Sequence, residues 1–171
     1  MRYRSVNAVE EFEFHDSRAE GGELRDGTLL LPLRSLNIHK NLPQNPSEYD
    51  MEIELAILRA EGFALREYSP CPECVRDEQG NFVPSEPRRV YHGEDGLARF
   101  TKDLGEGFYM FGWLVEQKEG AAVHTITCIG EGFVSDVSFT SEKITVEWDS
   151  YTDKAWYESD EWRKHRASEK D

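Results

Sequence analysis

The feature that most constrains the fold is a series of short apolar runs between Gly107 and Trp148, separated by glycine and charged residues. The runs cover residues 108–115, 122–129, 133–139 and 144–148, and they are rich in aromatic and β-branched side chains. Runs of this length and composition, bounded by turn residues, are typical of consecutive antiparallel strands. The second half of the chain therefore predicts a β-rich fold, and it carries no signature of an activity.

Residues 28–38 follow a strand pattern that changes face part-way along. The apolar alternation places its side chains on one face of a strand up to Leu33 and on the opposite face after Leu33. A strand of period two cannot change face without a bulge. Pro32 also removes a backbone donor from the run. We therefore expect either an edge strand or a strand bulged near Arg34.

Residues 51–60 fit either a helix or a strand. The preceding segment, residues 46–50, resembles a helix start. In a helix, however, the apolar side chains would surround the axis and leave no polar face. In a strand, Glu52 and Glu54 share one face, and the other face carries Met51, Ile53, Leu55 and Ile57. We predict the strand.

Residues 69–96 differ in composition from the segments around them. This segment holds four of the seven prolines, several charges and few apolar residues. A loop of that length in a compact domain is usually functional or mobile, and a small hairpin is expected within it around a turn at 79–81. We therefore predict a long loop or insertion over 69–96.

The predicted elements fit one β-rich domain over residues 1–171. Short helical turns are expected near both ends, over residues 5–11 and around Trp156, and a charged tail over 159–171 is expected to fray. The fold class that we predict is all-β, an antiparallel β-sandwich or partly open β-barrel of about 8–10 strands.

The chain carries a formal net charge of −14. Phosphate binding needs clustered Lys and Arg, so this charge argues against a nucleic-acid partner. An acidic surface favours solubility, and it also suits a basic protein partner. Both interpretations stay open.

Targeting features indicate the cytoplasm. Residues 2–7 contain no apolar signal-peptide core, and no apolar run approaches the ~18 residues of a membrane span. The three cysteines are an odd number, for which reduced thiols in a cytoplasm are the simplest account. We expect a cytoplasmic protein with no membrane partner.

Cys71 and Cys74 have the two-residue spacing with which two thiolates can bind one Zn²⁺. A structural zinc site needs four ligands, and His92 and Cys128 are the remaining candidates in the sequence. A redox pair normally opens a helix, which the neighbouring prolines disfavour. Two free surface thiols are the main interpretation, so we predict no cofactor and keep zinc as the alternative.

The sequence shows no catalytic signature. It contains no nucleophile elbow, no phosphate-binding glycine loop and no dinucleotide-binding fingerprint. His15 and Asp16, as strand neighbours, would point to opposite faces, and His124 in a strand suggests a structural role. Carboxylates are so numerous that a pair at glycosidase spacing is expected by chance. We predict no catalytic residue.

The strand expected at residues 108–115 carries apolar side chains on both faces. One interpretation is a central strand that is covered on both sides. The other is that one face lines a groove or an interface between copies of the chain.

Three segments together resemble a family of small bacterial cytoplasmic proteins of unknown function. They are Phe-Glu-Phe-His-Asp at 12–16, Glu-Leu-Ala-Ile-Leu-Arg-Ala-Glu-Gly-Phe at 54–63, and Val-Glu-Trp-Asp-Ser-Tyr with the following Ala-Trp-Tyr-Glu between 146 and 158. The Cys-Pro-Glu-Cys segment looks like an insertion relative to that pattern. The resemblance implies no activity, cofactor or catalytic residue.

Two functions of different classes are consistent with these features. The first is a non-catalytic binding or interaction protein, in one version an inhibitor or immunity-type protein whose acidic face covers a basic partner. The alternative is a carboxylate-dependent hydrolase that acts on a sugar-like substrate. A deep pocket with two facing carboxylates, one of them desolvated, would favour the hydrolase.

Overall fold

The computed structural model describes residues 1–118, 120–160 and 162. Sixteen strands, one α-helix and two short 3₁₀ helices occur among the described residues. In chain order they are β1 (Tyr3–Val6), η1 (Val9–Glu11), β2 (Phe12–Glu13), β3 (Arg18–Ala19), β4 (Glu23–Arg25), β5 (Thr28–Arg34), β6 (Leu36–Ile38), β7 (Met51–Ile53), β8 (Ala56–Glu61), β9 (Ala64–Pro70), β10 (Cys74–Arg76), β11 (Phe82–Pro84), α1 (Gly93–Glu106), β12 (Phe108–Lys118), β13 (Ala121–Gly130), β14 (Phe133–Thr140), β15 (Lys143–Trp148), β16 (Tyr151–Lys154) and η2 (Trp156–Glu158).

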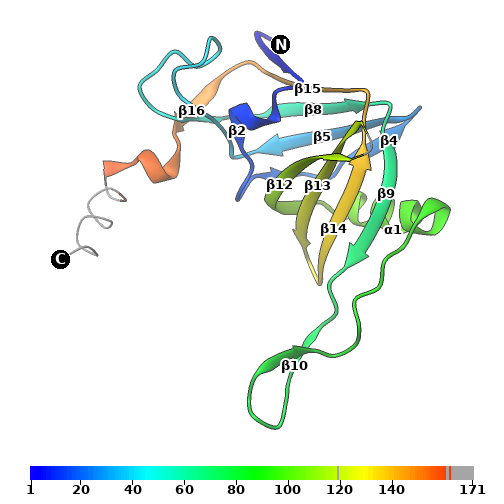
Figure 1. Cartoon of the computed structure of the whole chain (residues 1–171). Helices are drawn as coiled ribbons and strands as arrows, with labels where there is room; N and C mark the ends of the chain where they lie inside the picture. Colours follow the sequence, from blue (N-terminus) through cyan, green and yellow to red (C-terminus); the bar gives the residue numbers. More distant parts are fainter. Residues whose placement is uncertain (119, 161, 163–171) are drawn as a thin grey trace.

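The largest sheet contains ten strands in the order β1-β15-β8-β5-β3-β12-β13-β14-β9, with β4 also paired to β5 (Figure 1). Its strand pairs are antiparallel, as in β12–β13, β13–β14 and β15–β8. The end strands β1 and β9 do not pair with each other, so the sheet is open rather than a closed barrel. The predicted all-β antiparallel fold is confirmed, including the strands expected between Gly107 and Trp148, but about 8–10 strands were predicted and the described residues form sixteen.

A second, separate sheet has four strands in the order β16-β7-β6-β2. The chain passes from one sheet to the other between β5 and β6, where Ser35 has a φ of 54°. The change of face expected near Arg34 occurs there, but as a break between two strands rather than as a bulge within one. The alternative of an edge strand is wrong, because β5 has partners on both sides. Pro32 is tolerated there because it lies between the stretches of β5 that pair with β3 and with β4.

Residues 51–60 form strands, as predicted, but they form two of them. β7 ends at Ile53 and β8 begins at Ala56, so the alternation restarts after the gap. The buried side chains in β8 are Ala56, Leu58 and Ala60, whereas Leu55 and Ile57 are only half-buried. The predicted apolar face is therefore correct for Ile53 and wrong beyond the gap.

The segment predicted as a loop over 69–96 contains the expected hairpin, in which Cys74 to Arg76 pair with Pro84 to Phe82. This hairpin extends away from the sheets (Figure 1). The loop prediction is wrong at its end, because α1 begins at Gly93. Phe100 and Leu104, four residues apart, are buried on one face of α1, which packs against β9 and β4.

Both expected helical turns are present in shorter form, as η1 and η2. Ser5 lies in β1 rather than at a helix cap, and its hydroxyl donates to the Glu11 carboxylate at 2.5 Å. Most of the predicted tail at 159–171 lies outside the described residues. Among the described helices, none is both long and apolar enough to cross a membrane.

Candidate functional site

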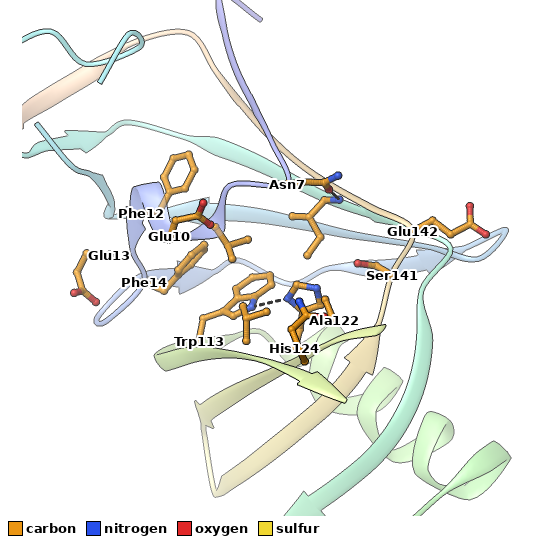
Figure 2. Close-up of a pocket in the computed structure, with 14 residues that line it drawn as sticks. Asn7, Glu10, Phe12, Glu13, Phe14, Trp113, Ala122, His124, Ser141 and Glu142 are labelled. Atoms are coloured by element: carbon orange, nitrogen blue, oxygen red, sulfur yellow. Dashed lines mark hydrogen bonds between the residues drawn. The ribbon is translucent and has the colours of Figure 1, made fainter. Parts of the chain in front are cut away.

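A cavity of about 650 Å³ lies between the N-terminal segment and the β12–β13 strand pair, and we call it the Trp113 pocket (Figure 2). Cavities of a few hundred to about 1,000 Å³ are typical of ligand sites. Its lining side chains come from three segments of the chain: Asn7, Val9, Glu10, Phe12, Glu13 and Phe14; Trp113, Val115, Gln117, Ala122 and His124; and Ser141, Glu142 and Ile144.

Strand periodicity explains how β12 contributes to this pocket. Trp113, Val115 and Gln117 are separated by two residues, so they lie on the same face of the strand. The Trp113 ring packs against Phe14 with ring centroids 4.7 Å apart, and Phe14 in turn packs against Phe12 at 6.1 Å. One wall of the pocket is therefore aromatic and continuous with the hydrophobic core.

His124 is fixed in one protonation state by its neighbour. The Trp113 indole N–H donates to His124 Nδ1 at 3.2 Å, and an indole nitrogen can only donate. Nδ1 must therefore carry a lone pair, which places the imidazole proton on Nε2. Burial also lowers the pKa of His124 below its ordinary value, because the charged ring would lose its hydration. The ring, which stacks on Phe139 at 5.3 Å, is neutral near pH 7.

The charged side chains that line the pocket are all acidic. Glu10, Glu13 and Glu142 contribute carboxylates, and no Lys or Arg lines this part of the described chain. Glu10 and Glu142 are exposed, whereas Glu13 is half-buried and accepts a hydrogen bond from the His15 backbone N–H at 2.9 Å. Figure 2 shows the Glu142 carboxylate directed away from the cavity. Glu10, Glu13 and Glu142 therefore lie at the edge of the pocket, and we call them the carboxylate rim.

Ser141 adds a polar atom inside this rim. Its hydroxyl oxygen is buried and has no hydrogen-bond partner among the described residues. Figure 2 shows that this hydroxyl points toward the cavity. A buried hydroxyl without a partner is unfavourable by about 1–3 kcal/mol.

The pocket lacks the arrangement that would favour a hydrolase. A general acid needs a desolvated carboxyl group, and Glu10 and Glu142 are exposed. Burial does raise the pKa of Asp103, partly offset by a hydrogen bond from the Tyr68 hydroxyl at 2.5 Å. That carboxyl lies between α1 and β9 and does not line the Trp113 pocket.

The structure does not gather the residues considered for zinc. Cys71 and Cys74 are exposed, and His92 uses Nδ1 to donate to the Arg66 carbonyl at 2.9 Å. Cys128 is buried in β13, and burial raises the pKa of its thiol. Across the described part of the chain, no three His, Cys, Asp or Glu side chains cluster in a way that could hold a metal ion.

His15 and Asp16 differ from the prediction. Their side chains were expected on opposite faces, but His15 Nδ1 lies 3.0 Å from an Asp16 carboxylate oxygen. The strand ends at Glu13, and Asp16 has a φ of 69°, so strand alternation no longer applies. Both side chains are substantially exposed, which is consistent with a surface contact.

The outer face of β12 is open. Phe108 and Met110 are buried, whereas Tyr109, Phe111 and Leu114 are 51%, 57% and 57% exposed. A central strand covered on both sides is therefore the wrong interpretation. The alternative, in which one face remains accessible, describes β12.

Sequence reasoning missed most of the pocket. The spacing along 108–115 indicated Trp113 as apolar, and His124 was predicted to be structural, but Glu10 and Ser141 had no distinguishing pattern. These residues meet only after strands far apart in the sequence pair. Comparisons of the chain with protein-family models, with curated proteins and with solved structures find no match. The resemblance to a bacterial family stays a prediction.

Proposed function

We propose that this chain is a non-catalytic binding protein whose Trp113 pocket takes a cationic side chain of a basic protein partner. The observation that carries the proposal is the composition of the pocket, which combines aromatic walls and a carboxylate rim without a lining Lys or Arg. This composition matches a ligand that has both an apolar stem and a positive charge, as Lys and Arg do.

Three physical effects support a cation in this pocket. The carboxylates of Glu10 and Glu142 give the opening a negative potential, and the net charge of −14 adds a long-range attraction. The accessible part of the Trp113 ring can contact a cation through its π face, which contributes about 0.5–2 kcal/mol. His124 adds no opposing charge, because its ring is neutral.

The proposal can be tested with acetylated pentalysine and ¹⁵N NMR of the Trp113 indole. We expect the Trp113 signal to shift on titration, with an affinity that falls as salt is raised, because exposed charges are screened. Glu10→Gln combined with Glu142→Gln should weaken binding by about tenfold, which corresponds to about 1.4 kcal/mol.

A matched control separates pocket binding from general attraction. Glu67→Gln combined with Glu78→Gln removes the same charge from two exposed carboxylates that do not line the pocket. This control should bind within about twofold of the unmodified protein. Equal weakening by the two double variants, or a Trp113 signal that does not move, would contradict the proposal.

A further inference from the structure

At its start β12 pairs with strands on both sides, and further along it pairs on one side. Phe108 and Tyr109 pair with β3, and Tyr109 also pairs with Ile129 of β13. A register shift between Met110 and Gly112 follows, and bulges of this kind often end a ladder. From Gly112 to Lys118 the strand pairs with β13, and no other described strand pairs with it.

Residues 112–118 therefore form an open strand edge, which we call the β12 edge. At about 3.4 Å per residue the edge is roughly 20 Å long. Alternate residues along it direct backbone N–H and C=O groups away from β13. Natural proteins usually cover such edges or block them with charges, because an open edge pairs readily with another chain. Here Gly112 to Val115 are uncharged, and Glu116 and Lys118 follow only at the far end.

The β12 edge also borders the Trp113 pocket. Trp113, Val115 and Gln117 line the pocket and belong to the edge. A strand that paired with this edge would continue the sheet, with every second side chain on the same face as these three. Those side chains would enter the pocket below the rim carboxylate of Glu10. The remaining side chains would lie on the outer face, beside the exposed Leu114.

We propose that the partner binds the β12 edge as an added β-strand, through an extended segment in which basic and apolar residues alternate. This inference rests on the proposed function, which it deepens by naming the form of the partner. Main-chain hydrogen bonds would supply affinity, and the acidic pocket would select basic side chains at alternate positions.

Charge complementarity favours a basic segment over a second copy of this chain. Each copy carries a net charge of −14. Pairing of two β12 edges would bring the carboxylate rims of the two copies together. Like charges across an interface disfavour association, whereas a basic strand gains from the same carboxylates.

The test uses the peptide acetyl-Lys-Val-Lys-Val-Lys-Val-Lys-amide and two derivatives of it, one N-methylated at all Val residues and the other at all Lys residues. Only every second amide of an added strand faces its neighbour, and N-methylation removes that donor. We expect the unmodified peptide to bind, at least one N-methylated derivative to lose tenfold or more in affinity, and alternate amides in Gly112–Lys118 to become protected from hydrogen exchange.

Two results would overturn strand addition. In the first, both N-methylated derivatives bind within about twofold of the unmodified peptide and no amide of the β12 edge gains protection; pocket binding, and with it the proposed function, would then stand without a strand. In the second, light scattering shows that the protein alone forms a dimer in which the same amides are protected, so that a second copy occupies the edge. Failure of all three peptides and of pentalysine to bind would reject the proposed function as well.

Discussion

The large sheet has a covered edge at β9 and an open edge along β12. At β9, Tyr68 exchanges two backbone hydrogen bonds with Tyr91, at 2.9 and 2.8 Å. Arg88 donates to the Ser69 carbonyl at 2.8 Å, and the ring of His92 donates to the Arg66 carbonyl at 2.9 Å. Helix α1 then packs against the strand. Along residues 112–118 of β12, no described strand fills the corresponding positions.

This difference indicates that edge protection is local rather than general in this protein. A helix and a connecting segment cover β9, although β12 has the more apolar exposed face. An apolar edge left open beside an acidic pocket is consistent with a place for a partner. If edge protection is local, substitutions at the two edges should differ in energy as the edges do in geometry.

The largest expected difference concerns two phenylalanines. Phe100→Ala removes a buried ring of α1 that stacks on Phe63 with centroids 5.8 Å apart, and it should lower the free energy of unfolding by about 3–5 kcal/mol. Phe111→Ala, at the β12 bulge, should change it by less than about 0.5 kcal/mol, because that ring is 57% exposed. Urea unfolding measures both, and equal losses would contradict the comparison.

A smaller difference is expected for two tyrosines. Tyr68→Phe removes the hydroxyl that donates to the Asp103 carboxylate between β9 and α1, and this should destabilise the fold by about 1–3 kcal/mol. Tyr109→Phe, on the exposed face of β12, should be nearly neutral.

The pH dependence sharpens the tyrosine comparison. Burial raises the pKa of Asp103, so the folded state binds this proton more tightly than the unfolded chain does. The stability that this group contributes is complete below its ordinary pKa of 3.8 and is lost as pH rises through the folded-state pKa. The loss of stability caused by Tyr68→Phe should therefore grow from acidic to neutral pH, as measured by thermal unfolding. A penalty independent of pH would argue against a carboxylate partner for Tyr68.

The smallest effect is expected at the pocket histidine. Burial lowers the pKa of His124 below 6.5, so the unfolded chain binds the proton more tightly and stability falls as pH drops below about 6.5. One such group contributes at most about 1.4 kcal/mol per pH unit. His124→Gln should flatten the slope measured by urea unfolding between roughly pH 7.5 and 5.5. An unchanged slope in His124→Gln would show that this ring is not held neutral.

Strands were the most predictable part of this fold. The apolar runs after Gly107 depend on local periodicity, which the sequence contains in full. Helix α1 was not predicted, because Gly93, Gly96 and Gly105 weaken its helical character and the preceding prolines suggested a loop. The spacing of Phe100 and Leu104 was the signal that could have revealed it.

The pocket could not be predicted for a different reason. Glu10, Trp113 and Ser141 are far apart in the sequence, and their meeting depends on which strands pair. Strand order is set by long-range contacts, and no local pattern encodes it. The open edge of β12 has the same origin, since a strand's own residues do not reveal whether both of its sides are paired.

The most direct test of the account is an isotope-filtered NMR experiment on labelled protein with unlabelled acetyl-Lys-Val-Lys-Val-Lys-Val-Lys-amide. Adjacent strands bring backbone atoms of the two chains close enough for nuclear Overhauser effects between them. We predict such contacts between the peptide backbone and residues 112–118, together with contacts from Lys side chains to the Trp113 ring. Contacts from Lys side chains alone, or backbone contacts at β9 in place of β12, would contradict the account.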